Sequence, residues 1–285
     1  MAFDPKRLPD SLIEAYREKR CVALVGAGAS RAAGLPLWSE LLTKMIDEAK
    51  RHRIINEPKA REYRKLVKRP EKYLMLATGL KEELGTAYFE PFIRKMFLAP
   101  KPKPTKIHDA LVEANRLQLI VTTNYDTILE RRYREVDADV AVCTFLDVGE
   151  VQSRMSKRQF FILKAHGDAS KAGSGIILTD MDYRRILYRE RAYQSLLSSI
   201  FTMFTVVFIG ASMTDPEVTL LLHYIADSFS PGSGPLHYAV MAKEEITNVE
   251  KDRWLRDLNV QFVPITNAGN YAEIHQFLRA LHAAA

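Results

Sequence analysis

The chain has 285 residues, of which 47% are hydrophobic and 27% charged, and this composition excludes a disordered or fibrous protein. Its two cysteines are too few for a four-cysteine zinc site, and both lie in apolar runs, so we expect buried thiols in a reducing cytoplasm. The formal net charge of +6 comes from dispersed lysines and arginines, which favours solvated helix faces over a nucleic-acid patch. No apolar run has the length of a membrane span and no signal-peptide pattern is present, so we expect a cytoplasmic protein.

Apolar runs alternate with segments of helical periodicity along the chain. A helix is predicted over residues 10–20, with Ser11 as its N-cap, and the apolar run 21–25 that follows it predicts a buried strand. Residues 39–104 are largely charged and helical and end in a run of alternating proline and lysine, which predicts a helical insertion. The later strands are expected over residues 117–122, 140–144, 160–164, 175–178, 206–209, 236–241 and 260–264.

Strands that are apolar along their whole length and separated by helices are typical of a parallel sheet covered on both faces. We therefore predict an α/β fold, a Rossmann-like doubly wound parallel sheet with a helical insertion at about residues 39–104, in a single domain spanning residues 1–285. Ligands of such sheets bind at the carboxyl ends of the strands. Each of the polar motifs considered below follows a predicted strand, so we expect these motifs to share one edge of the sheet.

A glycine-rich loop follows the first strand. Gly26 and Gly28 permit a tight turn with bare backbone amides, and Ser30 offers a hydroxyl to a phosphate oxygen or to the cap of the next helix. The plainer interpretation is an ordinary strand-to-helix turn. A second rigid turn with Pro36 follows. Because no third glycine has the dinucleotide-binding spacing and no acidic residue ends a second strand, a hydride-transferring dehydrogenase is disfavoured.

Two further motifs carry candidate chemistry. Asn124 follows a buried strand and offers both a donor and an acceptor without charge, although asparagine is also common in turns. Asp126 is expected to cap the helix that follows. His166 ends another strand and precedes a glycine, so it suits a general base near neutral pH, although a lone histidine is more often a satisfied core or surface residue. The remaining histidines have no comparable context: His52, His108, His223, His237, His275 and His282.

The late strands supply weaker candidates of the same kind. Gly210 and Ser212 follow the strand 206–209, shortly before a proline-started helix, and they are placed to hold a ribose or a phosphate. Asn267 follows the last strand in a similar position. An ordinary strand-to-helix junction is the simpler interpretation of each.

The order of these motifs resembles that of the sirtuins: a GAG-x-S loop, a Gly-x-Pro turn, an Asn-x-Asp motif, a His-Gly pair and a late Gly-x-Ser. Three departures are informative. Leu37-Trp38-Ser39 stands in place of Asp-Phe-Arg, no cysteine lies between His166 and Gly210, and Tyr125 replaces the usual aliphatic residue beside the asparagine. In these respects the chain resembles the sirtuin-like NAD hydrolases of bacterial antiphage defence, which lack zinc.

This resemblance implies cleavage of the bond between nicotinamide and ribose, which depletes cellular NAD after infection. Asn124 would position the water and a ribose hydroxyl, and His166 would bond a ribose hydroxyl or activate the nucleophile. The glycine-loop residues would hold the pyrophosphate, and Ser212 and Asn267 the adenosine side. The residues expected to contact NAD, apart from those two catalytic ones, are Gly26, Ala27, Gly28, Ser30, Pro36, Asp126, Gly210, Ser212 and Asn267.

The resemblance also implies a homo-oligomer held inactive until a trigger arrives, with a sensor or helicase-like ATPase as a separate partner protein. Nucleic acid would then act only indirectly, and no membrane or zinc is expected. Three alternatives remain open: an NAD-dependent protein deacylase, a non-catalytic regulatory subunit that binds NAD or another nucleotide, and a nucleic-acid-binding protein, which rests only on the diffuse positive charge.

Overall fold

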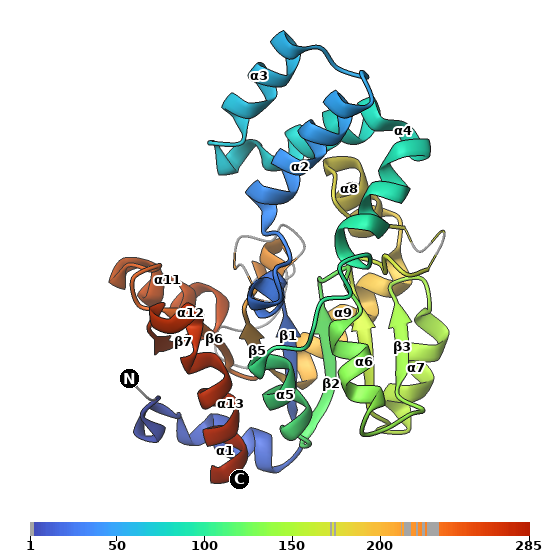
Figure 1. Ribbon diagram of the computed structural model, residues 1–285. Helices are drawn as coiled ribbons and strands as arrows, with labels where there is room; N and C mark the ends of the chain where they lie inside the picture. The colour runs from blue at the N-terminus through green and yellow to red at the C-terminus, as the bar shows by residue number, and fades with distance from the viewer. Residues whose placement is uncertain are drawn as a thin grey trace.

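The computed structural model describes residues 3–171, 173, 175–211, 213, 218–220, 222–223, 226 and 234–285. Within them, seven parallel strands form one sheet in the order β3-β4-β2-β1-β5-β6-β7 (Figure 1). The strands are β1 Cys21–Val25, β2 Leu117–Thr122, β3 Ala141–Thr144, β4 Phe161–Lys164, β5 Thr205–Ile209, β6 His237–Ala242 and β7 Val260–Ile265. The predicted doubly wound α/β fold is confirmed.

The order in which strands are added to the sheet reverses at β1. The chain forms β2, the edge strand β3 and then β4 between them on one side of β1, and it crosses to β5 on the other side, so β1 lies between β2 and β5. The loops after β1 and β5 therefore meet at the carboxyl edge. This is the place where open parallel sheets leave a crevice for a ligand.

Helices cover both faces of the sheet and bury an apolar layer on each. One face is packed by α1 Asp10–Arg17, α5 Lys106–Glu113, α6 Ile128–Arg134 and α13 Glu273–Ala284. The other is packed by α7 Val148–Ser156, α8 Asp180–Tyr188, α9 Arg191–Met203 and α11 Asn248–Leu258. Short helical turns complete the described elements: η1 Pro5–Arg7, η2 Ala27–Ala33, η3 Pro70–Lys72 and α12 Ala268–Tyr271.

The helical insertion rises above the carboxyl edge of the sheet (Figure 1). It consists of α2 Trp38–Arg51, α3 Glu57–Leu66 and α4 Tyr73–Phe97. These helices build a third apolar core, which also takes in Tyr125, Ala169 and Leu178 from loops of the sheet. The insertion is thus joined to the sheet by the same segments that carry the polar motifs.

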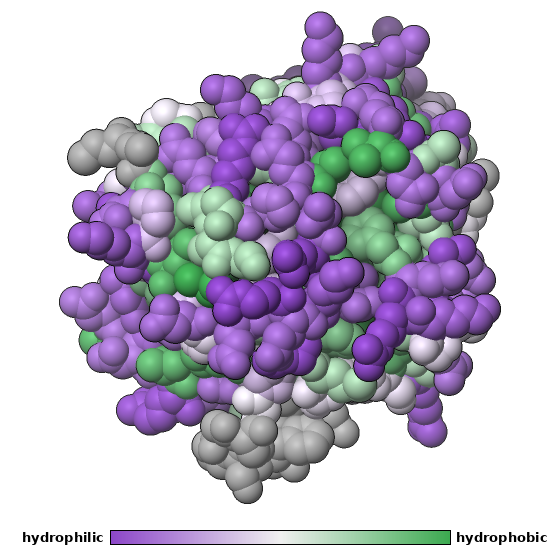
Figure 2. All heavy atoms as spheres, turned by 90° about the horizontal axis from the view of Figure 1, so that it is seen from below, coloured by the Kyte–Doolittle hydropathy of each residue, from purple (hydrophilic) through white to green (hydrophobic). Residues whose placement is uncertain are grey.

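The opposite end of the molecule has a different character. Both chain ends lie there, near α1 and α13 (Figure 1). Its surface is mostly hydrophilic, and hydrophobic side chains form small separate patches (Figure 2). This pattern is what a solvated face is expected to show.

Two local predictions were wrong. Ser11 lies inside α1, whose N-cap is Pro9, and its hydroxyl shares a 2.7 Å hydrogen bond with the Tyr238 hydroxyl. The apolar run 175–178 is not a strand, although its second half, Ile177 and Leu178, is fully buried. The Ile177 amide donates to the His166 carbonyl in the loop after β4, and the Ile177 carbonyl accepts from the Tyr125 hydroxyl.

His237 at the start of β6 makes the stability of the fold pH-dependent. Its Nδ1 accepts the Val206 amide at 3.1 Å, and burial lowers its pKa from 6.5 to about 4. The folded chain keeps this ring neutral while the unfolded chain binds a proton below about pH 6.5. Its contribution to stability is therefore complete above that pH and is lost as the pH falls toward about 4.

We predict that the free energy of unfolding falls by about 3 kcal/mol through this group between about pH 6.5 and pH 4. His237→Asn keeps an acceptor for the Val206 amide but does not titrate, so its stability should fall less over this range. Urea unfolding at several pH values measures the difference. An identical pH slope in both proteins would show that His237 does not carry this effect.

Candidate active site

The loops after β1, β2 and β4 enclose a small cavity of about 60 Å3. Six residues predicted from the sequence line it: Ala27, Ser30, Pro36, Asn124, Asp126 and His166. The other lining residues are mainly apolar: Leu35, Leu37, Trp38, Leu41, Phe97, Thr123, Tyr125 and Leu178. A few convergent polar groups in an apolar cavity are the usual composition of a small-molecule site.

Ser30 is the hydrogen-bonding centre of this cavity. Its hydroxyl donates to Asp126 Oδ2 at 3.0 Å and accepts from Asn124 Nδ2 at 3.2 Å, and the side chain is 1% exposed. A carboxylate can only accept, so the single hydroxyl proton lies toward Asp126. The remaining lone pairs must then receive donors, which orients the Asn124 amide with its nitrogen toward Ser30.

That orientation leaves an acceptor open at the cavity. Asn124 Oδ1 is buried and has no hydrogen-bond partner among the described residues. A buried acceptor without a partner is costly unless a bound group satisfies it. Asn124 therefore presents an oxygen that suits a hydroxyl or water donor.

His108 is a member of this network that the sequence analysis missed. It is buried, and its Nδ1 accepts the Thr105 amide at 3.1 Å, so its proton resides on Nε2. Nε2 lies 3.5 Å from Ser30 Oγ, and burial lowers the His108 pKa, which favours the neutral ring. The only sequence signal was the spacing of Thr105 and His108, which form a capping box at the start of α5.

Asp126 is positioned by a backbone amide and His166 by a neighbouring aromatic ring. Asp126 Oδ1 accepts the Ile128 amide at 2.9 Å, which is the first amide of α6. The N-cap of that helix is Thr127, so the prediction that Asp126 is the cap was wrong by one residue. His166 is 3% exposed, and its ring packs edge-on against Tyr183 with centroids 5.4 Å apart. Gly167 adopts a φ of +90°, which lets the chain turn sharply after His166.

The buried ammonium of Lys164 stabilises the loop that carries Asn124 and Asp126. Lys164 at the end of β4 lies 2.5 Å from Glu130 on α6 and 3.6 Å from Asp168, and it donates to the Asp126 carbonyl. Burial opposes its charge, but the carboxylates of Glu130 and Asp168 outweigh that effect and raise the Lys164 pKa. The ammonium thus ties β4 to the loop that carries Asn124 and Asp126.

The predicted glycines serve a close contact between two loops. The amides of Gly26 and Gly28 donate to the carbonyls of Ile209 and Gly210 at 3.0 and 2.9 Å. A Cβ on Gly28 would lie 2.8 Å from the Gly210 oxygen, and one on Gly210 would lie 2.6 Å from the Ala29 nitrogen. Gly210 also has a φ of +58°. Side chains at these positions are therefore excluded by backbone on the other loop.

The remaining candidates lie elsewhere. Asn267 precedes α12 beyond the end of β7 and does not line the small cavity. Ser212 lies outside the described residues, as do Asp215 and Pro216. The contacts of these residues with a ligand therefore stay predictions.

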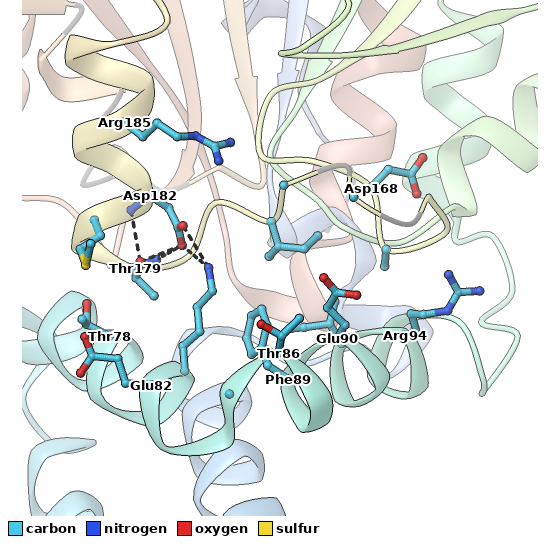
Figure 3. A pocket seen from close by; sticks show the side chains of 18 of the residues that line it. Thr78, Glu82, Thr86, Phe89, Glu90, Arg94, Asp168, Thr179, Asp182 and Arg185 are labelled. Atoms are coloured by element: carbon cyan, nitrogen blue, oxygen red, sulfur yellow. Dashed lines mark hydrogen bonds and ion pairs between the residues drawn. The ribbon is translucent and has the colours of Figure 1, made fainter.

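A larger cavity of about 580 Å3 lies between α4, α8 and the loop after β4 (Figure 3). Arg94 and Glu90 line it from α4, Arg185 and Asp182 from α8, and Asp168 from the loop. Both Asp182 carboxylate oxygens accept from the Lys81 amine, at 2.8 and 2.9 Å. The lining therefore carries charges of both signs.

Neither a metal-binding cluster nor a membrane-spanning helix is found among the described residues. No group of three or more His, Cys, Asp or Glu side chains in this part of the chain could hold a metal ion. None of its helices has the length and apolar character needed to cross a membrane.

The fold and cavity define a doubly wound α/β protein with a candidate small-molecule site at its sheet edge. The SIR2-like domain family matches residues 118–263, just over half of the chain, and the chain belongs to this family. The resemblance inferred from the motif order is thereby confirmed. A solved structure of Sir2Tm bound to a propionylated peptide aligns over 95% of both chains, with 12% identity and a TM-score of 0.47.

Two curated relatives come from bacilli. Defense-associated sirtuin 2 of Bacillus subtilis is 26% identical over 216 residues, which is 75% of this chain and 20% of the relative. NAD(+) hydrolase ThsA of Bacillus cereus (strain MSX-D12) is 24% identical over 277 residues, which is 93% of this chain and 54% of the relative. The chain thus spans about half of the second relative and a fifth of the first.

We predict that Gly28→Ala lowers the free energy of unfolding by about 1–3 kcal/mol, because the added methyl group meets backbone that cannot yield easily. Gly149→Ala is the matched control. Gly149 lies in α7 with open space around it, so alanine there should be neutral or stabilising. Urea unfolding of both variants tests the contact, and equal effects would argue against it.

We predict that Lys164→Met lowers the free energy of unfolding by about 3–5 kcal/mol, because Glu130 is left buried without its cation. Adding Glu130→Leu should restore part of the loss. Lys171→Met removes a surface lysine and should change little. Thermal or urea unfolding measures all three, and a double variant less stable than Lys164→Met would contradict this account.

Proposed function

We propose that the chain hydrolyses NAD at the bond between nicotinamide and ribose and acts as an effector of antiphage defence. The observation that carries the proposal is that Asn124 and His166, from the loops after β2 and β4, line one cavity at the carboxyl edge of the sheet. Membership of the SIR2-like family supports it. So do the relatives named NAD(+) hydrolase ThsA and Defense-associated sirtuin 2.

The reaction needs little general-acid catalysis from the protein. When the bond between C1′ of the ribose and the pyridinium nitrogen breaks, the electron pair leaves with nicotinamide, which departs as a neutral base. The ribose carbon gains oxocarbenium character, as in other glycoside hydrolysis. The site must therefore position water and stabilise developing charge.

Asn124 and His166 have distinct parts in this scheme. The open Asn124 Oδ1 accepts a hydrogen bond from the attacking water or from a ribose hydroxyl, and the network through Ser30 keeps that oxygen facing the ligand. His166 bonds a ribose hydroxyl or takes the proton that the water loses. Asp126 acts mainly by holding Ser30.

The rest of the nucleotide would lie along the loops after β1, β5 and β7. The amides of Gly26 and Gly28 already donate to the loop after β5, so these glycines would contribute by allowing the pyrophosphate to approach closely. Ser212 and Asn267 would contact the adenosine side. In this proposal the chain forms a homo-oligomer under the control of a separate sensor or ATPase.

A protein deacylase is the second candidate, because a cavity large enough for part of a second substrate lies beside the site. It requires that substrate to reach His166 from the larger cavity. An assay with an acetylated peptide, with and without NAD, separates the two: hydrolysis needs no peptide, whereas deacylation consumes NAD only in its presence.

We predict that His166→Ala and Asn124→Ala each reduce nicotinamide release from NAD by about 100-fold or more, since a positioned acid–base group or a preorganised hydrogen-bonding amide typically contributes that much. His52→Ala, at an exposed residue just after the end of α2, should retain activity. Circular dichroism checks the fold, and chromatography measures the nicotinamide. If both site variants turn NAD over like the unmodified chain, the assignment of these residues is wrong.

A further inference from the structure

The two cavities lie back to back. The small cavity is lined by Phe97 on α4 and by Leu178, which follows the loop after β4. Ile93, one turn earlier on α4, and the neighbours Ile176 and Thr179 line the large one. The end of α4 and the segment 176–179 each place some residues against the small cavity and neighbouring residues against the large one. These two segments therefore form a wall between the cavities.

The wall is closely packed. Ile177 and Leu178 are fully buried and Ala169 nearly so. Phe97, Tyr125, Ala169 and Leu178 belong to one apolar core, so the side chains that meet in the wall are largely apolar.

Tyr125 bonds to this wall through both its side chain and its backbone. Its hydroxyl donates to the Ile177 carbonyl at 2.6 Å, and its own carbonyl accepts the Ala169 amide at 3.0 Å. Its ring packs edge-on against Phe97, with centroids 5.2 Å apart. The Ile177 amide completes the closure by donating to the His166 carbonyl at 3.1 Å.

We propose that Tyr125 determines which nucleophile receives the ADP-ribosyl group. By fastening the segment at Ile177, it closes the route from the large cavity to His166, so water is accepted and bulky nucleophiles are excluded. The inference rests on the proposed NAD hydrolysis and adds to it the residue that limits the size of the acceptor.

The competing reaction is balanced without a further reactant. The C1′–N bond breaks and its electron pair leaves with neutral nicotinamide. A bond then forms between C1′ and the oxygen of an alcohol, and the hydroxyl proton of the alcohol passes to His166 or to solvent. The products are an alkyl ADP-ribose, nicotinamide and a proton, in place of ADP-ribose.

The test is competition between water and two alcohols of different size. NAD is cleaved in the presence of equal, non-denaturing amounts of methanol or 1-propanol, and the alkyl ADP-ribose is separated from ADP-ribose. A tight pocket discriminates about tenfold or more for an added methylene. We therefore expect the unmodified chain to form at least about ten times less propyl than methyl product.

Two variants should relax this preference. Tyr125→Phe removes the hydrogen bond to Ile177 and keeps the ring, and it should raise the ratio of propyl to methyl product several-fold. Tyr125→Ala removes the ring as well and should raise it further. The ratio is read from the products, so a lower turnover does not change its meaning. If Tyr125→Ala does not fold, Tyr125→Phe alone decides.

Tyr133→Phe is the matched control. Tyr133 is equally buried, and its hydroxyl donates to the Leu111 carbonyl at 2.7 Å in a core away from both cavities. It should keep the ratio of the unmodified chain. A folded Tyr125→Phe with an unchanged ratio, or with no propyl product, would overturn the inference. If the unmodified chain releases no nicotinamide at all, the proposed function fails instead.

Discussion

The Ser30 hydroxyl fixes the geometry on which the candidate site depends. It has one proton and two lone pairs, and all of its neighbours are consistent with one assignment: the proton goes to Asp126, and Asn124 and His108 donate. One side chain from the loop after β1 thus sets the orientation of an amide from the loop after β2. The Asn124 amide is uncharged and could be placed either way round, so its orientation is determined by the Asp126 carboxylate through Ser30.

This arrangement changes the meaning of the glycine-rich loop. A glycine motif after the first strand is commonly interpreted as a phosphate cradle. Here the glycines bring the loops after β1 and β5 into backbone contact. Ser30, which donates to Asp126, follows in the same loop after β1. The same residues can serve a nucleotide as well, but their packing role is sufficient to require glycine.

The main architecture could be predicted from the sequence because each parallel strand is an uninterrupted apolar run, and residues that end such strands must meet at one edge. Asn124, Asp126 and His166 were found in this way. The run 175–178 has the same composition, yet its partners are a loop and the Tyr125 hydroxyl. Composition cannot distinguish burial under a loop from burial in a sheet. His108 was missed for a related reason, since Ser30, its partner at the cavity, is distant in sequence and its helix is ordinary.

The third apolar core has a consequence for the energetics of the molecule. It contains the helices of the insertion together with Tyr125, Ala169 and Leu178, so the small cavity is complete only while α2 and α4 are docked on the sheet. Local opening of the insertion would dismantle the cavity without unfolding the sheet. A ligand that occupies the cavity must then disfavour that opening by mass action, and it should protect α2 and α4 from hydrogen exchange and proteolysis. The insertion and the ligand therefore stabilise one another.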